Sequence, residues 1–145
     1  MKNTYRARGE LRICVEHSDG SAEIIRVNNK VVEIGEQFIA ARMIDNATAV
    51  VSHMAIGQGT TAASASDTAL ESELGRATVT AARDGNKVTY TAIFAAGVGT
   101  GAITEAGLFN AESGGLMPCR SVFGVKTKAA TDVITISWDV FIEAQ

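Results

Sequence analysis

The residue types most often used in catalysis and metal binding are few in this chain. Its two histidines, His17 and His53, have no cysteine or carboxylate at ligand spacing, so the sequence predicts no metal site. Ser52 places a hydroxyl beside the His53 imidazole, but neighbouring residues of a strand point to opposite faces, and no G-x-S-x-G motif is present. Cys14 and Cys119 lie in apolar, strand-like contexts far apart in the sequence. This favours free buried thiols, although a disulfide between them stays open.

Two glycine-rich loops invite comparison with phosphate-binding loops. Residues 57–61 read G-Q-G-T-T and lack the lysine of a P-loop, and residues 97–101 precede an expected strand rather than a helix. Neither loop matches a nucleotide-binding motif in the context that such a motif requires. The sequence therefore predicts no cofactor.

Carboxylate pairs are the remaining candidates for chemistry. Glu71 with Glu73, or Glu105 with Glu112, could act as acid and base in a glycosidase. The aromatic residues that usually accompany a sugar site make up only 6% of the chain. Salt bridges are therefore the preferred interpretation, and we predict that Arg76 pairs with Glu73 or Glu105. No residue is assigned a catalytic role.

Composition and charge narrow the class of protein. The chain has 145 residues, 46% of them hydrophobic and 20% charged, which is typical of one globular domain over residues 1–145. The net charge of -3 and the interleaving of basic with acidic residues before Lys30 argue against nucleic acid as a partner. The sequence shows no secretory signal and no apolar run long enough to cross a membrane. Residues 1–8 form a candidate N-terminal arm.

Strand-like segments separated by turns follow one another along most of the chain. In residues 9–17 and 133–142 apolar side chains alternate with polar ones, and Asp84-Gly85 between two such runs is a strong hairpin signal. This pattern predicts a mainly β fold, an antiparallel β-sandwich or jelly-roll-like barrel with one or two short helices. We expect a helix at 35–43 and strands at 9–17, 23–27, 49–56, 77–83, 87–95, 103–111, 116–126 and 133–142.

The stretch 56–76 connects two expected strands through a glycine-rich turn and a linker of small side chains. The other elements must be positioned around it. Its glycines supply backbone freedom, and residues 64–67 and 68–71 both match the [ST]-x-x-[DE] capping pattern. Leu70 and Leu74 are spaced to dock one or two helical turns on the core. We interpret the stretch as a structural corner or interface whose candidate residues are Gly57, Gly59, Thr60, Thr61, Ala62, Ala63, Asp67, Glu73, Arg76 and Glu105.

Several segments together resemble structural modules of tailed bacteriophages. These are IG-x-G-T-T at 56–61, D-T-x-L-x-x-E-x-x-R at 67–76, ITEAGLFNAESGGLM at 103–117, Arg120 with the following Phe123, and VITISWDVFIEA at 133–144. Similar segments occur in tail-fibre or collar-associated proteins and in small capsid-associated proteins. The resemblance covers roughly the last two thirds of the chain.

The resemblance implies a β-rich, non-enzymatic virion protein that is made in the host cytoplasm and forms a homo-oligomer, in the first instance a homotrimer. The first expectation is a head decoration (cement) protein that clamps neighbouring subunits of the major capsid protein. The small side chains of residues 60–65 would allow close approach at a seam between subunits, and several contacts per trimer would add avidity. The alternatives are an adaptor or fibre-head module of the tail, neck or baseplate, and a small virion-associated glycan hydrolase.

Overall fold

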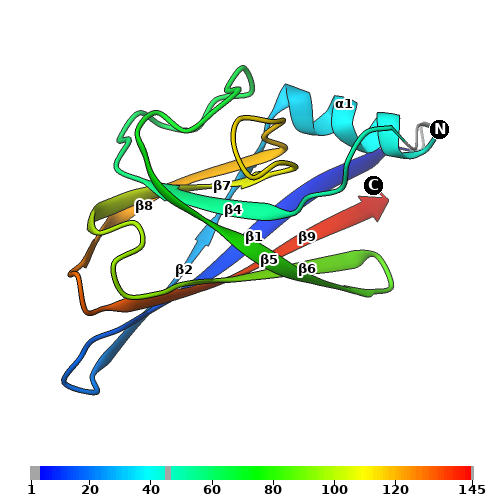
Figure 1. Cartoon of the computed structure of the whole chain (residues 1–145). Coiled ribbons are helices and arrows are strands. Elements are labelled where there is room, and N and C mark those ends of the chain that lie inside the picture. Colours follow the sequence, from blue (N-terminus) through cyan, green and yellow to red (C-terminus); the bar gives the residue numbers. More distant parts are fainter. Residues whose placement is uncertain (1–3, 45–46, 145) are drawn as a thin grey trace.

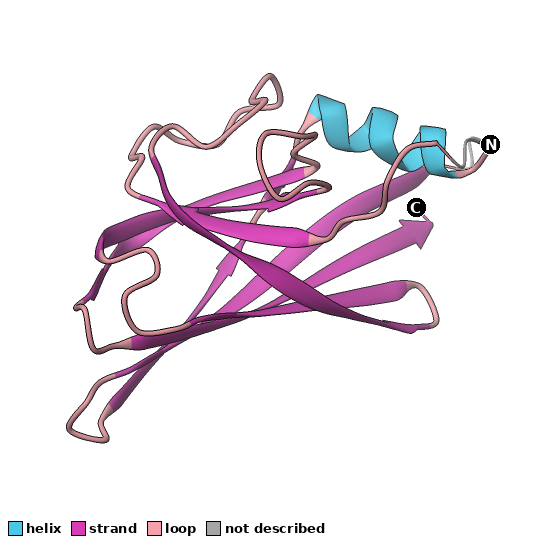
Figure 2. Ribbon diagram, in the orientation of Figure 1, coloured by secondary structure: helices cyan, strands magenta, loops and turns pink. Residues whose placement is uncertain are grey.

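The computed structural model describes residues 4–44 and 47–144. Within these residues the chain forms nine strands and one helix. Figure 1 labels the elements except β3, and Figure 2 colours them by type. The helix is α1 (Glu33–Arg42), and the strands are β1 (Tyr5–Glu16), β2 (Ala22–Asn28), β3 (Lys30–Val31), β4 (His53–Gly57), β5 (Glu73–Asp84), β6 (Lys87–Phe94), β7 (Gly101–Phe109), β8 (Cys119–Lys128) and β9 (Val133–Ala144).

The strands form one antiparallel sheet that folds over into two layers. Its strand order is β2-β1-β9-β6-β5-β4-β7-β8-β3. Strands β2, β1, β9 and β6 make the first layer, the lower one in Figure 1, and β4, β7, β8 and β3 make the second layer above it. Strand β5 belongs to both layers, because Thr78 pairs with His53 of β4 and Val79 pairs with Ala92 of β6.

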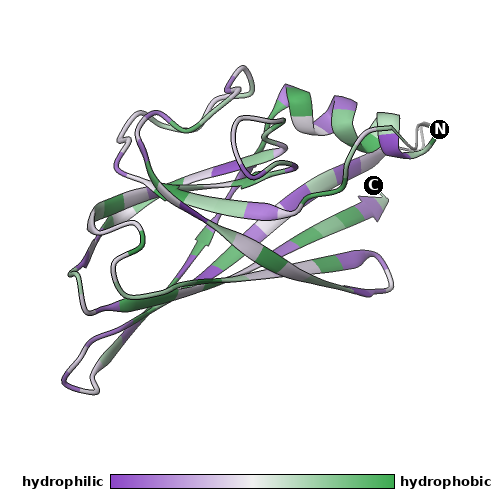
Figure 3. Cartoon of the chain, in the orientation of Figure 1, coloured by the Kyte–Doolittle hydropathy of each residue, from purple (hydrophilic) through white to green (hydrophobic). Residues whose placement is uncertain are grey.

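The core fills the space between the two layers. Alternation along β1 buries Leu11, Ile13 and Val15, and alternation along β9 buries Ile136 and Trp138. Figure 3 shows the alternation of apolar and polar residues along the strands. The predicted inward faces of β1 and β9 are therefore confirmed.

The mainly β prediction is also confirmed, and the arrangement is sandwich-like, because the sheet is not closed into a barrel. Side chains, rather than a backbone ladder, join the layers at the open side. The Ser121 hydroxyl donates to the Asn28 carbonyl at 2.8 Å, and Lys126 Nζ lies 3.4 Å from Glu23 Oε1.

Helix α1 confirms the helix expected at 35–43, with ends shifted by one or two residues. Its interior Gly35 is explained by packing, since a Cβ there would lie 2.1 Å from the Pro118 carbonyl oxygen. The N-terminal end of the helix is capped by backbone, not by a side chain: Glu33 N–H donates to the Ala65 carbonyl at 2.7 Å. The helix therefore binds the chain segment around Ala65 to the second layer.

Each of the eight predicted strands overlaps a strand of the structure, and their ends shift. The predicted strand 49–56 begins only at His53, while β5 begins at Glu73, four residues earlier than expected. The turn expected at 127–131 is also shorter, because residues 127 and 128 belong to β8.

Two expectations for other segments differ from the structure. Residues 5–8 of the candidate N-terminal arm belong to β1 and pair with β9, with Tyr5 opposite Ala144, and residues 1–3 lie outside the described residues. The one or two helical turns expected around Leu70 and Leu74 do not form: Leu74 lies in β5, and the residues before Glu73 form a loop.

Candidate functional site

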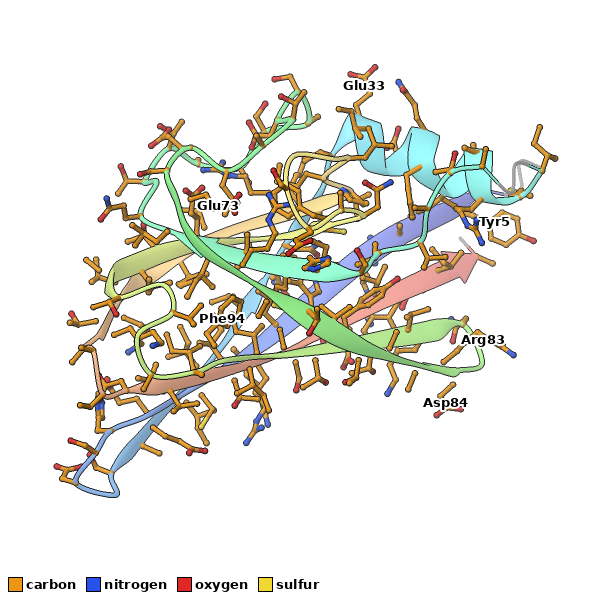
Figure 4. The ribbon with its side chains drawn as sticks, in the orientation of Figure 1. Tyr5, Glu33, Glu73, Arg83, Asp84 and Phe94 are labelled. Carbon is orange, nitrogen blue, oxygen red and sulfur yellow. The ribbon has the colours of Figure 1, made fainter. Side chains whose placement is uncertain are left out.

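The predicted corner is a loop that covers the outer face of the second layer. We call residues 58–72, between β4 and β5, the corner loop. It crosses the side of the sheet that carries Glu105, Gly107 and Phe109, while Leu108 on the alternate side enters the main core. Figure 4 labels Glu73, where the corner loop joins β5, and Phe94 in the interior between the layers.

Glu105 on β7 fixes both ends of the corner loop. Its side chain is fully buried, and its Oε1 accepts hydrogen bonds from the N–H groups of Gly59 at 3.0 Å and Ser72 at 2.7 Å. Its Oε2 accepts the Glu71 N–H at 3.0 Å. These N–H groups donate to one carboxylate instead of to the carbonyls of a helical turn, which is why the predicted helix is wrong.

Arg120 on β8 completes this buried cluster. Its Nε and Nη2 donate to Glu105 Oε2 at 3.1 and 2.9 Å, and its Nη1 donates to Asp67 Oδ2 at 2.8 Å. Burial by itself lowers the pKa of the Arg120 guanidinium, but the hydrogen bonds to Glu105 and Asp67 outweigh it and raise that pKa overall. We call Glu105, Arg120 and Asp67 the ion cluster.

The ion cluster was not predicted, although both of its buried members stood out. Glu105 was predicted as one of two alternative partners of Arg76, whereas it pairs with Arg120. The sequence does contain a signal for this pair. Glu105 lies within the apolar run 103–109, and Arg120 lies between Cys119 and Ser121. Because charged side chains are rarely buried without a partner, two such residues in strand-like segments indicate a buried ion pair.

Gly57 and Gly59 are required for close approach, not for backbone freedom. Neither has a positive φ. A Cβ at Gly57 would lie 2.3 Å from the Ser72 carbonyl oxygen, and a Cβ at either glycine would lie 2.6 Å from Glu105 Oε1. The prediction that these glycines supply backbone freedom is therefore wrong, and packing is the reason for glycine at both positions.

The corner loop also has a small apolar anchor. Leu70 is 9% exposed and packs with Ala55, Phe109 and Met117 in a cluster separate from the main core. Gly107 lies beneath it, since a Cβ at that position would approach the side chains of Met117, Phe109 and Leu70 at 2.9 to 3.1 Å. Such close approach of neighbouring side chains to the backbone is typical of a glycine within a strand.

Arg76 fixes the neighbouring loop, residues 110–118, which we call the hairpin loop. It confirms one of the two predicted pairings, with Nη2 and Nε donating to the two carboxylate oxygens of Glu73 at 2.7 and 3.0 Å. Its Nη1 donates to the carbonyls of Ala111 and Gly114, and its guanidinium stacks over the Phe109 ring at 3.8 Å. The Arg76 side chain is 9% exposed, so this contact is largely shielded from water.

Above these buried contacts the corner loop presents short side chains. Thr60, Thr61 and Ala62 are exposed, and Ala63 is half-buried. Two open hollows of about 350 Å³ each flank this segment, one floored by Arg120 and the other lined by Ala62 and Ala63. The ten predicted corner residues thus lie together at one end of the second layer, with Glu73, Arg76 and Glu105 as supports rather than as exposed contacts.

The candidates for catalysis take structural positions. Contrary to the expectation that Ser52 and His53 point apart, Ser52 Oγ lies 2.8 Å from His53 Nδ1. Within residues 4–44 and 47–144, no carboxylate forms an ion pair with His53 to orient it as a catalytic base. Of the two carboxylate pairs considered for a glycosidase, one includes Glu105, whose oxygens are occupied by backbone and Arg120 donors.

His17, expected to have no carboxylate partner, has two. Its Nε2 lies 2.8 Å from Glu23 Oε2 and its Nδ1 lies 3.1 Å from Asp132 Oδ2. The hydrogen bonds that the His17 ring makes to Glu23 and, to a smaller extent, to Asp132 raise the His17 pKa. These contacts join the β1–β2 turn to the β8–β9 turn.

The structure also bears on the cysteines, on metal binding and on membrane-spanning helices. Cys14 and Cys119 are both free, and burial raises the pKa of the Cys119 thiol to about 12. In the described part of the chain, no cluster of three or more histidine, cysteine, aspartate or glutamate side chains could hold a metal ion. Nor does the helix found there have the length and apolarity needed to span a bilayer.

Comparison with known proteins adds no relative. A scan against protein-family models gave no match, and searches of curated proteins and of solved structures gave no significant match. Functional interpretation of the corner loop therefore rests on the chain's own residues.

Proposed function

We propose that this chain is a non-enzymatic virion structural protein, and specifically a head decoration protein whose corner loop docks at a seam between capsid subunits. The observation that carries the proposal is the contrast between the two sides of this loop. Its outer side is made of short, exposed side chains, Thr60 to Ala62, while its inner side is fixed by Glu105 and Arg120.

This construction suits docking better than chemistry. A loop that is already held in one conformation loses less conformational entropy when it binds a partner. Short side chains let the partner approach the backbone closely, and the hollows on either side can receive larger side chains from it. A reaction would instead need polar groups that are free to contact a substrate. The donors and acceptors of the ion cluster already form hydrogen bonds with one another and with the corner loop.

The distribution of exposed apolar side chains supports association of several copies. Among the described residues nine large hydrophobic side chains are exposed, and five of them lie on segments around the C-terminal end of α1, the start of β1 and the end of β9. Apolar side chains gathered in this way mark interaction sites. We assign this apolar end to the proposed homotrimer contact; its members are Tyr5, Met43, Ile44, Val50 and Ile142.

The first test is the copy number of the chain relative to the major capsid protein in purified virions, by quantitative mass spectrometry. A ratio near stoichiometric supports a head decoration protein. A ratio of a few per cent supports the tail, neck or fibre adaptor instead, and absence from the particle refutes a virion role.

The second test addresses the corner loop directly. Ala62→Trp should abolish binding to capsids while the oligomer stays folded, because the bulky ring prevents close approach. Ala130→Trp, at an exposed alanine of the β8–β9 turn, is the matched control and should bind normally. Capsid binding by Ala62→Trp at the level of wild type would reject the corner loop as the docking element.

A further inference from the structure

The outer face of the first layer carries charges in rows. Residues that alternate with the core positions of β2, β1, β9 and β6 point away from the second layer. Arg26 lies opposite Arg12 in one row, and Glu10 lies opposite Asp139 in the next. An open hollow of about 460 Å³ follows these two rows and is lined by Glu10, Leu11, Arg12, Arg26, Val27, Asn28, Ser137 and Asp139.

The positive row is unfavourable within one chain. Like charges directly opposite each other on neighbouring strands destabilise a sheet. Among the described residues, neither Arg12 nor Arg26 has an ion pair or a side-chain hydrogen bond. By contrast, the nearby Arg8 is bound to both Glu10 and Glu143. Two neighbouring guanidinium groups without a carboxylate are therefore available to an acidic group from outside the chain.

We propose that this face binds the same face of a second copy of the chain across a two-fold axis. The positive and negative rows are two residues apart along the strands, about 7 Å. A two-fold axis that runs parallel to the rows, midway between them, places the positive row of each copy over the negative row of the other. Arg12 of one copy then faces Glu10 of the second copy, with Arg26 beside it, and the same contact is made twice.

Charge complementarity favours a second copy over a simple anion. An anion held by Arg12 and Arg26 would also lie close to Glu10 and Asp139, which repel it. A second copy instead places Arg12 over Glu10 twice, and Glu10 then lies between Arg8 of its own chain and Arg12 of the other. The face is also suited to flat packing, since Cys14, Ser137 and other small side chains fill it between the charges. Two sheets in such contact lie about 10 Å apart.

Apolar side chains on both sides of the charged rows add buried area to this contact. Ile24 and Ile93, which are 53% and 61% exposed, flank the positive row, and the half-buried Phe141 flanks the negative row. The two-fold contact is separate from the apolar end and does not depend on a virion role.

Charge reversal tests the proposal with the full-length chain. Arg12→Glu and Glu10→Arg should each halve the particle mass measured by sedimentation equilibrium, from two chains to one or, with the proposed homotrimer contact, from six chains to three. An equimolar mixture of the two variants should recover the wild-type mass, because one variant carries carboxylates at both positions and the other carries guanidinium groups at both. Arg83→Glu, which makes the same charge change near the end of β5, should leave the mass unchanged.

Two results would overturn the proposal. One is a wild-type mass for Arg12→Glu, and the other is failure of the mixture to recover the mass although both variants give wild-type circular dichroism. A rise in melting temperature with inorganic phosphate, without any effect of Arg12→Glu on mass, would show that the arginines bind an anion only and would equally reject a second copy.

Discussion

Replacing Glu105 with glutamine should show how strongly the ion cluster holds the corner loop. The Glu105 carboxylate is fully buried and accepts three backbone N–H groups and two guanidinium donors. A glutamine side chain has one oxygen and one NH₂ group, so in either orientation the NH₂ faces donors and leaves them unpaired. Arg120 also loses its fully buried partner.

The expected cost follows from this geometry. Breaking a buried ion pair by neutralising one partner costs about 3–5 kcal/mol of folding free energy. This figure includes the cost of leaving the N–H donors buried without an acceptor. For a domain of this size that corresponds to a fall in melting temperature of roughly 10 °C. Glu143→Gln, at the partly exposed pair with Arg8, is the matched control and should change stability far less, because water screens that pair.

Urea unfolding followed by Trp138 fluorescence gives the free energy of unfolding for each variant. Hydrogen exchange adds a local readout: the amides of Gly59, Glu71 and Ser72 should be protected in the wild type and should exchange rapidly in Glu105→Gln. An unfolding free energy within about 1 kcal/mol of the wild type, together with undiminished protection of these three amides, would refute the role given to the ion cluster.

Three further predictions test neighbouring contacts. Arg76→Met should lower the free energy of unfolding by about 2 kcal/mol and loosen the hairpin loop, and unchanged thermal stability would contradict this. Gly57→Ala should cost at least about 2 kcal/mol because its Cβ would meet a backbone carbonyl, whereas Gly124→Ala, with no atom within 4 Å, should be nearly neutral in thermal melts. Because the pKa of His17 is raised, the stability from its carboxylate contacts is complete below its ordinary pKa of 6.5 and is lost as pH rises through the raised value. His17→Gln should flatten this pH dependence in urea titrations, and a wild-type pH profile in that variant would exclude His17 as its source.

The sequence predicts those parts of the fold that depend on local pattern. Alternation in β1 and β9 identifies the inward faces, and Asp84-Gly85 identifies the β5–β6 turn. The pairing of Arg76 with Glu73, one of the two alternatives predicted, is also local, because the register shift of β5 at Leu74 brings residues three positions apart onto one face. In each case the signal and the structure lie within the same few residues.

The corner loop could not be predicted in the same way, because distant residues determine its conformation. Local capping patterns favour a helical turn, but Glu105 and Arg120, from two other strands, supply the hydrogen-bond partners instead. Likewise, the need for glycine at Gly57 depends on Ser72, which only the folded loop brings close. Tertiary contacts outweigh local propensity here, as is common for short helical patterns.

The pairing of β1 with β9 has a consequence for how the protein folds. Tyr5 pairs with Ala144 and Glu16 with Val133, so the middle of the first layer joins strands from opposite ends of the chain. Until β9 is in place, β1 and β6 each have an unpaired edge facing the gap that β9 fills. Pairings at such long sequence separation make folding slow and leave open edges that invite aggregation. We therefore expect β9 insertion to limit the folding rate, so that substitutions in β9 slow refolding more than substitutions in the β5–β6 hairpin.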